Sequence, residues 1–126
     1  MTAGLATAHA HGILNVFRGT TYTAPAGVFV KLHTGDPGSA GTANASAVTT
    51  RNQATFAAPS AGSMALSSLS GYSMTGTETI SHISLWDASS GGNFLQSAAL
   101  SASKNVTSGD TLTLTTLTIA YTPIAA

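Results

Sequence analysis

The sequence predicts a mainly β domain, a β-sandwich or jelly-roll-like fold, with one short N-terminal helix. Several short segments alternate apolar and polar residues, and clusters of Gly, Ser, Pro and Asp separate them. Helical spacing of apolar residues occurs near the N-terminus, within residues 2–18. The chain has 126 residues, so we expect one domain over residues 1–126.

The N-terminal helix is expected at residues 2–18. Leu5, His9 and Ile13 recur at intervals of four residues, and Phe17 continues the same stripe. A single short helix is not stable by itself in water. We therefore expect its apolar stripe to lie on the sheet or on a neighbouring subunit.

The first core strand is expected at residues 28–33. Its two valines and Leu32 share one face, whereas Phe29 and His33 share the other. Because both faces carry large side chains, the strand should be covered on both sides for part of its length.

A long segment without periodicity follows at residues 34–51. It opens with the turn sequence Asp36-Pro37-Gly38, in which Gly38 can take the positive φ of a type II turn. Loops of this length in compact domains are usually functional or disordered. Ordering such a loop costs about 1–2 kcal/mol per residue. We therefore expect an extended arm that is fixed only against another chain.

Residues 52–122 are expected to form the body of the β-sandwich. Within it, residues 88–92 form the clearest hairpin loop, between one strand at 79–87 and another at 93–100. Each of these strands alternates apolar and polar residues, as a half-buried strand does.

The last expected strand, residues 111–121, changes phase within its length. Its first apolar residues, both leucines, occupy even positions, and the later ones occupy odd positions. A regular strand cannot place all of them on one face. We expect either a β-bulge at Thr115-Thr116 or a passage there from one packing environment to another.

The low content of charged residues is the clearest signal in the composition. Asp, Glu, Lys and Arg make up 6 % of the chain, and the formal net charge is zero. An ordinary soluble domain has about 25 % charged residues. A neutral, charge-poor surface does little to oppose association, so we expect a protein that is packed in an assembly. The alternative is a monomer with a surface rich in Ser and Thr.

Other classes of partner find no support in the sequence. The four basic residues are scattered, so we expect no nucleic-acid partner. The N-terminus has no signal-peptide pattern, and no apolar run reaches the length of a membrane helix, so we expect no membrane partner. The chain has no cysteine, which excludes disulfides and thiolate chemistry.

Residues capable of catalysis or metal binding do not form a recognisable set. The four acidic residues are expected at turns or strand ends, where such side chains usually bind their own backbone. No serine lies in a Gly-x-Ser-x-Gly motif. The four histidines lack metal-ligand spacing, although they could converge in the fold. We therefore expect no enzyme activity, no cofactor and no metal.

Two segments of the sequence carry a resemblance to a known family. The first combines Leu32-His33-Thr34-Gly35-Asp36-Pro37-Gly38 with Gly41-Thr42-Ala43-Asn44 and Arg51, and the second is Ser81-His82-Ile83-Ser84-Leu85-Trp86-Asp87-Ala88-Ser89-Ser90-Gly91-Gly92. Together they resemble small virion proteins of tailed phages, many from actinobacterial hosts, which are named as tail fibre, minor tail or head decoration proteins. The resemblance spans most of residues 13–100. In one departure, Ala45 follows Asn44 where we expect an acidic residue.

The resemblance implies a structural component of the virion, assembled in the host cytoplasm and released with the particle. Our first hypothesis is a capsid decoration protein, a homotrimer that binds the major capsid protein on the outer head surface and stabilises the shell. A tail fibre or minor tail protein for host attachment is the first alternative, with tail proteins as partners and Tyr22, Tyr72 and Trp86 as receptor contacts. The second alternative is a carbohydrate-binding module that uses Trp86, or a small hydrolase, although the sparse acids and the lack of a nucleophile motif count against it.

The residues expected at interfaces come from the helix, the long loop and the second signature. They are Leu5, Ile13, Phe17, His33, Asp36, Pro37, Asn44, Arg51 and Trp86.

Overall fold

The computed structural model describes residues 3–120 and confirms a mainly β fold with one short helix. Helix α1 spans Thr7–Phe17. Within the described residues the strands are β1 (Val28–His33), β2 (Asn52–Phe56), β3 (Ser63–Ser68), β4 (Tyr72–Ser73), β5 (Glu78–Trp86), β6 (Phe94–Val106), β7 (Thr111–Leu112) and β8 (Thr118–Ala120). No helix in this part of the chain is long and apolar enough to cross a membrane.

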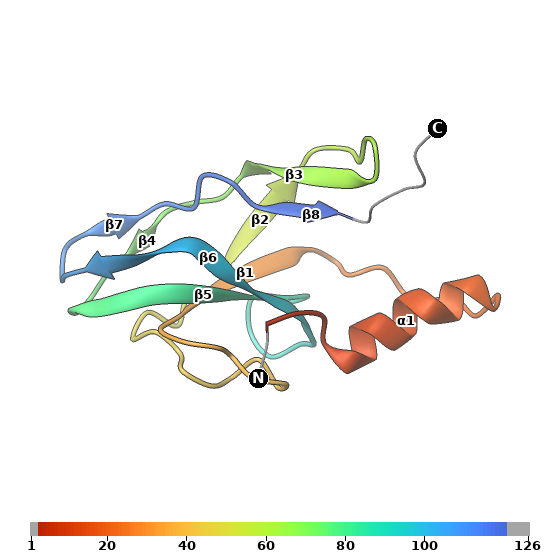
Figure 1. Ribbon diagram of the computed structural model, residues 1–126, viewed down its shortest axis with the longest axis horizontal. Coiled ribbons are helices and arrows are strands. Elements are labelled where there is room, and N and C mark those ends of the chain that lie inside the picture. Colours follow the sequence, from red (N-terminus) through yellow and green to blue (C-terminus); the bar gives the residue numbers. More distant parts are fainter. Residues whose placement is uncertain (1–2, 121–126) are drawn as a thin grey trace.

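The strands form a curled sheet and a small ribbon. Six strands pair in the order β6-β5-β1-β2-β3-β8, and β4 pairs with β7. The curl brings β3 and β8, together with the β4–β7 ribbon, over one face of the central strands (Figure 1). The β1–β2 loop, residues 34–51, lies on the other face (Figure 1). The result is a sandwich-like arrangement in which the central strands are covered on both sides.

The main core lies between the central strands and the curled part of the sheet. The register of β1 against β5 places Val30 opposite Leu85 and Leu32 opposite Ile83, and all four side chains are buried. Tyr72 reaches this core from β4, and its hydroxyl donates a hydrogen bond to the Val30 carbonyl at 2.5 Å. Burial raises the pKa of Tyr72 to about 12, so the hydroxyl stays protonated and able to donate at neutral pH.

The first strand begins and ends where the sequence predicts, and it is covered on both faces. Lys31 and His33 lie on its second face, opposite Ser84 and His82 of β5. Both His33 and Ser84 are fully buried there. The side chains of the second face are covered by the β1–β2 loop.

The β1–β2 loop is not the extended arm that the sequence predicts. It folds back on its own sheet, where the Thr34 N–H donates to the Asn44 carbonyl at 2.8 Å and the Ser46 N–H donates to the Leu32 carbonyl at 3.1 Å. Val48 joins the hydrophobic core. These contacts lie within one chain, and they hold the loop in place. The loop therefore does not need a second chain to be ordered.

Turn chemistry explains how the loop reverses direction. The carboxylate of Asp36 accepts a hydrogen bond from the Gly38 N–H at 2.8 Å, and Gly38 has a φ of 74°. Asn44, with a φ of 52°, donates its side-chain amide to the Asp36 carbonyl at 2.9 Å. Asn and Gly are the residues that tolerate a positive φ best. The expected turn at Asp36-Pro37-Gly38 is therefore confirmed, and it leads the chain back to the sheet.

The N-terminal helix begins later than the sequence predicts. Residues 4–6 are extended and pair with the outer edge of β6, where the Ala6 N–H donates to the Leu95 carbonyl at 2.8 Å and the Ser97 N–H donates to the Gly4 carbonyl at 2.8 Å. The helix starts only at Thr7 and projects beyond the sheet (Figure 1). The first residue of the expected helix, Thr2, lies outside the described residues.

The expected change within the last strand is confirmed as a passage between two packing environments. Residues 111–112 pair with β4, whereas residues 118–120 pair with β3. The residues between them belong to neither strand. The predicted end of this strand, Tyr121, lies outside the described residues, as does Thr122 at the end of the expected sandwich body.

The packing of the loop on β6 predicts unequal effects of two glycine substitutions. Gly41 and Gly91 both have positive φ, so Gly41→Ala and Gly91→Ala should each cost about 1–2 kcal/mol of backbone strain. A Cβ at Gly41 would lie 2.6 Å from the Phe94 ring, whereas a Cβ at Gly91 meets nothing within 4 Å. We expect Gly41→Ala to lower the free energy of unfolding by about 1–3 kcal/mol more than Gly91→Ala. Denaturant unfolding measures both, and equal losses would contradict the packing of the loop.

Candidate functional site

The two signature segments meet on the second face of β1 and β5. There, Nε2 of His33 lies 2.7 Å from Oγ of Ser84, and Nε1 of Trp86 donates to the same oxygen at 2.8 Å. The other ring nitrogen of His33, Nδ1, lies 2.8 Å from the Ala43 carbonyl. A carbonyl can only accept, so Nδ1 carries the hydrogen and Ser84 donates to Nε2. This chain of hydrogen bonds joins the β1–β2 loop to β5.

The hydrogen-bond chain is enclosed and electrically neutral. His33 and Ser84 are 0 % exposed. Burial lowers the pKa of His33, while the hydrogen bond to the Ala43 carbonyl acts in the opposite direction. The Ser84 hydroxyl is used by two neighbours and has no access to solvent. The pair is therefore arranged to connect parts of the fold and not to attack a substrate.

Arg51 fastens the end of the loop to the β5–β6 hairpin. Its guanidinium carbon lies 3.9 Å from the centre of the Trp86 ring, as in a cation–π contact. Its Nη1 donates to the Ala88 carbonyl at 3.1 Å and to the Gly91 carbonyl at 2.7 Å. Phe94 packs against the same indole, with ring centres 5.4 Å apart. Trp86 is thus covered by its own chain.

The hairpin loop at residues 88–92 is closed by Asp87. Its carboxylate accepts from the Asn93 N–H at 2.6 Å and from the Asn93 side-chain amide at 2.9 Å. These hydrogen bonds lower the pKa of Asp87. The expected hairpin between β5 and β6 is confirmed.

Several predicted interface residues lie inside the domain, which corrects their expected role. His33 is 0 % and Trp86 is 6 % exposed, and Pro37 is also fully buried. Asp36, Asn44 and Arg51 use their side chains to hold the loop and the hairpin in place. These side chains were expected to contact a partner because the loop was expected to be an extended arm. In the structure they contact the domain's own sheet and hairpin instead.

The remaining predicted residues belong to the N-terminal part and are more accessible. Leu5 is 45 % and Phe17 is 85 % exposed, whereas Ile13 is half-buried. Leu14 and Val16, which are not among the predicted interface residues, are 60 % and 59 % exposed. The signal for Leu14 was present in the sequence, because apolar residues occur on more than one side of the predicted helix. We call Leu14, Val16 and Phe17 the apolar tip of α1.

Two of the three predicted receptor contacts are also buried, which corrects that expectation. Tyr72 is 2 % exposed and its hydroxyl is bonded within the core, and the ring of Trp86 is covered by Arg51. Tyr22 is half-buried against α1, where its hydroxyl lies 2.6 Å from Nδ1 of His9. Neither Tyr72 nor Trp86 offers a ring face to a receptor or a sugar.

The histidines do not converge. Across residues 3–120, no three His, Asp or Glu side chains are placed so that they could hold a metal ion together. His33 is enclosed by the loop, and His9 lies on the helix against Tyr22.

Comparison with known families finds a match over most of the chain. The model of the family described as "Podophage GP4 fiber I protein gp80" matches residues 4–122, which is almost the whole chain. The match covers both signature segments, the helix and the strands. No curated protein matches the chain.

The stacking of Arg51 predicts that lysine cannot replace it. In Arg51→Lys the charge remains, but an ammonium group cannot lie flat on the indole and hold two carbonyls in a fixed geometry. We expect a loss of about 1–2 kcal/mol in the free energy of unfolding. Arg18→Lys is the control, because Arg18 is exposed and bonds only to the Asn15 side chain across one helical turn. Equal losses in the two variants would show that the stack contributes nothing.

The enclosed histidine predicts a pH dependence of stability. Burial holds the pKa of His33 below its ordinary value, so the unfolded chain binds more protons than the folded protein as the pH falls below about 6.5. The contribution of the neutral His33 to the free energy of unfolding is complete above this pH. It is lost as the pH falls toward the lowered pKa that His33 has in the folded state. His33→Asn should flatten the dependence of the unfolding free energy on pH between 7.5 and 5, each pH being measured by denaturant titration.

His9→Gln provides the control for this experiment. Burial lowers the pKa of His9 too, but the side chain is only partly covered. We therefore expect His9→Gln to change the slope less than His33→Asn. An unchanged slope in His33→Asn would contradict the enclosed, neutral state of His33.

Proposed function

The chain belongs to the Podophage GP4 fiber I protein gp80 family and is a structural protein of a phage virion, and on this premise we propose that it is a subunit of a virion fibre. We propose further that the apolar tip of α1 attaches the subunit to a neighbouring chain. The family match supports the fibre, and the exposure of the helix supports the mode of attachment.

The apolar tip is the observation that carries this proposal. Leu14, Val16 and Phe17 expose more than half of their surface at the end of a helix that projects from the sheet (Figure 1). Contiguous exposed apolar side chains mark interaction sites. Burying each of them in an interface would contribute about 1.5–3 kcal/mol. A projecting helix can insert into a neighbour without any change in the sheet.

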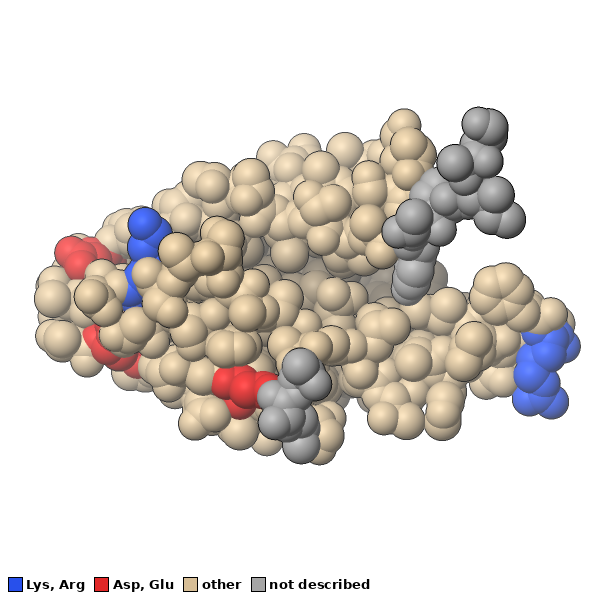
Figure 2. Space-filling view, in the orientation of Figure 1, with Lys and Arg blue, Asp and Glu red and all other residues tan. Residues whose placement is uncertain are grey.

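The surface of the domain supports an assembled state. Figure 2 shows that most of one face carries neither acidic nor basic side chains. The whole chain has four acidic and four basic residues. Such a surface offers little electrostatic repulsion between neighbouring subunits.

The family match favours the fibre alternative over our first hypothesis of capsid decoration. Binding to the outer head surface, a homotrimeric state, and contact with the major capsid protein or with tail proteins stay predictions. The carbohydrate-binding alternative loses its main support, since Arg51 and Phe94 cover Trp86. We propose a structural role without enzymatic activity, and the enclosed position of Ser84 and His33 supports it.

Incorporation into virions tests the proposal. Leu14→Ser combined with Phe17→Ser removes most of the apolar tip and leaves the sheet unchanged, so the variant should fold. We expect its copy number per particle to fall at least tenfold when it complements a phage that lacks the gene. Ala8→Ser is the control, because Ala8 is an exposed residue of α1 outside the tip.

The measurement is quantitative mass spectrometry of purified virions, with the major capsid protein as the internal standard. A fibre subunit should be present in tens of copies or fewer. Hundreds of copies would indicate capsid decoration instead, and normal incorporation of the double variant would exclude attachment through the apolar tip. Thermal unfolding of the isolated variants verifies that each of them is folded.

A further inference from the structure

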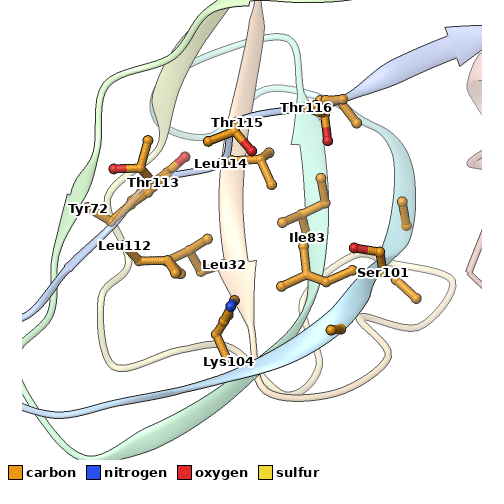
Figure 3. Close-up of a pocket in the computed structure, with 15 residues that line it drawn as sticks. Leu32, Tyr72, Ile83, Ser101, Lys104, Leu112, Thr113, Leu114, Thr115 and Thr116 are labelled. Atoms are coloured by element: carbon orange, nitrogen blue, oxygen red, sulfur yellow. The ribbon is translucent and has the colours of Figure 1, made fainter.

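A cavity of about 220 Å³ lies between β6 and the segment that joins β7 to β8 (Figure 3). We call it the slot. Residues 98–102 line one wall, and residues 112–117 line the other. Successive side chains of an extended chain point to opposite faces. A cavity that touches every residue of two such segments therefore borders their backbone edges, and Leu32 of β1 and Ile83 of β5 also line it.

Backbone groups on both walls lack partners. β6 is the outermost strand of the sheet, and residues 4–6 pair with its outer edge only as far as Ser97. Farther along, His82 pairs with Ala99 and Ile80 pairs with Lys104, so residues 100–103 bulge away from regular pairing with β5. On the other wall, residues 113–116 make no backbone–backbone hydrogen bond within residues 3–120. Residues 113, 115 and 116 and residues 101–104 are exposed, so their backbone groups are open to pairing with a strand of another chain, as at an exposed sheet edge.

The interior of the slot is apolar and small. Leu32, Ile83 and Leu114 point into it (Figure 3). Pockets for drug-sized ligands usually measure about 300–1,000 Å³. The slot instead has room for one or two apolar side chains, as alternate residues of a strand would supply them.

One charge marks the slot. Among the described residues that line it, Lys104 alone is charged, and its side chain extends toward the cavity (Figure 3). A carboxylate on the incoming segment would complement it. The Asp and Glu side chains of this chain form hydrogen bonds within it, namely Asp36 with Gly38, Glu78 with Ser46 and Ala47, Asp87 with Asn93, and Asp110 with Thr107. A second copy of this chain is therefore poorly suited to supply the acid.

From these features we propose that the slot accepts an extended strand of a different virion protein, with apolar residues at alternate positions and an acidic residue beside Lys104. The strand would pair with residues 113–116 and with the edge of β6, as in strand addition to a sheet edge. That the partner belongs to the virion rests on the proposed function. The slot and the apolar tip of α1 are separate sites on the molecule.

Hydrogen exchange measured by mass spectrometry tests the strand addition. The amides of residues 113–116 should exchange within seconds in the isolated protein and at least a hundredfold more slowly in purified virions. The exposed turn at residues 108–110 is the internal control and should change little. Equal exchange of residues 113–116 in the two samples would overturn the inference. The copy number of the protein does not enter this result, so the fibre proposal and the strand addition can fail independently.

Two pairs of variants test whether the backbone N–H of Thr115 and the charge of Lys104 are needed for binding in the slot. Within each pair, the second variant controls for general loss of structure. Thr115→Pro removes one backbone N–H, whereas Thr115→Val removes only the hydroxyl. We expect Thr115→Pro to enter virions at least tenfold less than Thr115→Val. Lys104→Glu should likewise be incorporated at least fivefold less than Lys104→Gln. Thermal denaturation shows whether Thr115→Pro is folded. If it is not, the comparison of the two Lys104 variants and the hydrogen-exchange data decide whether a strand binds in the slot.

A photo-crosslinking residue placed at Thr115 identifies the occupant of the slot in virions. Crosslinks to alternate residues of one segment in another virion protein, with Asp or Glu within that segment, support the inference. Crosslinks to copies of this chain alone, or none in a sample whose residues 113–116 exchange freely, overturn it.

Discussion

The hydrogen-bond chain from Ala43 through His33 and Ser84 to Trp86 is the constraint on which the second face of the sheet depends. It crosses from the β1–β2 loop to two residues of β5, and each polar atom in it has a partner. Buried polar groups are tolerated only when they are paired, so the chain holds the loop in one position. Arg51 then lies over Trp86 and bonds the hairpin. The β1–β2 loop and the loop of the β5–β6 hairpin are thereby held against each other.

This internal fixation changes which parts of the molecule remain for contact with other chains. Polar side chains of the loop form hydrogen bonds with the sheet, such as the one that Ser46 donates to Glu78. Tyr22 supports helix α1 at His9 and Gly12, whereas its apolar tip stays in solvent. The slot beside β6 also remains open, because the chain passes from β7 to β8 without pairing there. The scarcity of charge over much of the surface suits such a part of an assembly (Figure 2).

The sequence predicted what local patterns determine. The alternation of apolar and polar residues located β1. The Asp-Pro-Gly turn and the glycine hairpin lie where their residue types require, and the change of phase marked the break in the last strand. It could not predict contacts between distant residues. Gly4 bonds Ser97, 93 positions away, and Arg51 bonds Gly91, 40 positions away, and no local pattern specifies either partner. For this reason local patterns alone predict an arm at residues 34–51 and an interface role for His33 and Trp86, which are buried in the fold.

A cryo-EM reconstruction of the virion at side-chain resolution tests the central claim most directly. The account predicts the protein in a fibre, with residues 34–51 closed on their own sheet as in the isolated domain and Leu14 and Phe17 buried against a neighbouring chain. A map in which residues 34–51 leave the sheet to bind a neighbour, while α1 stands free in solvent, would contradict it.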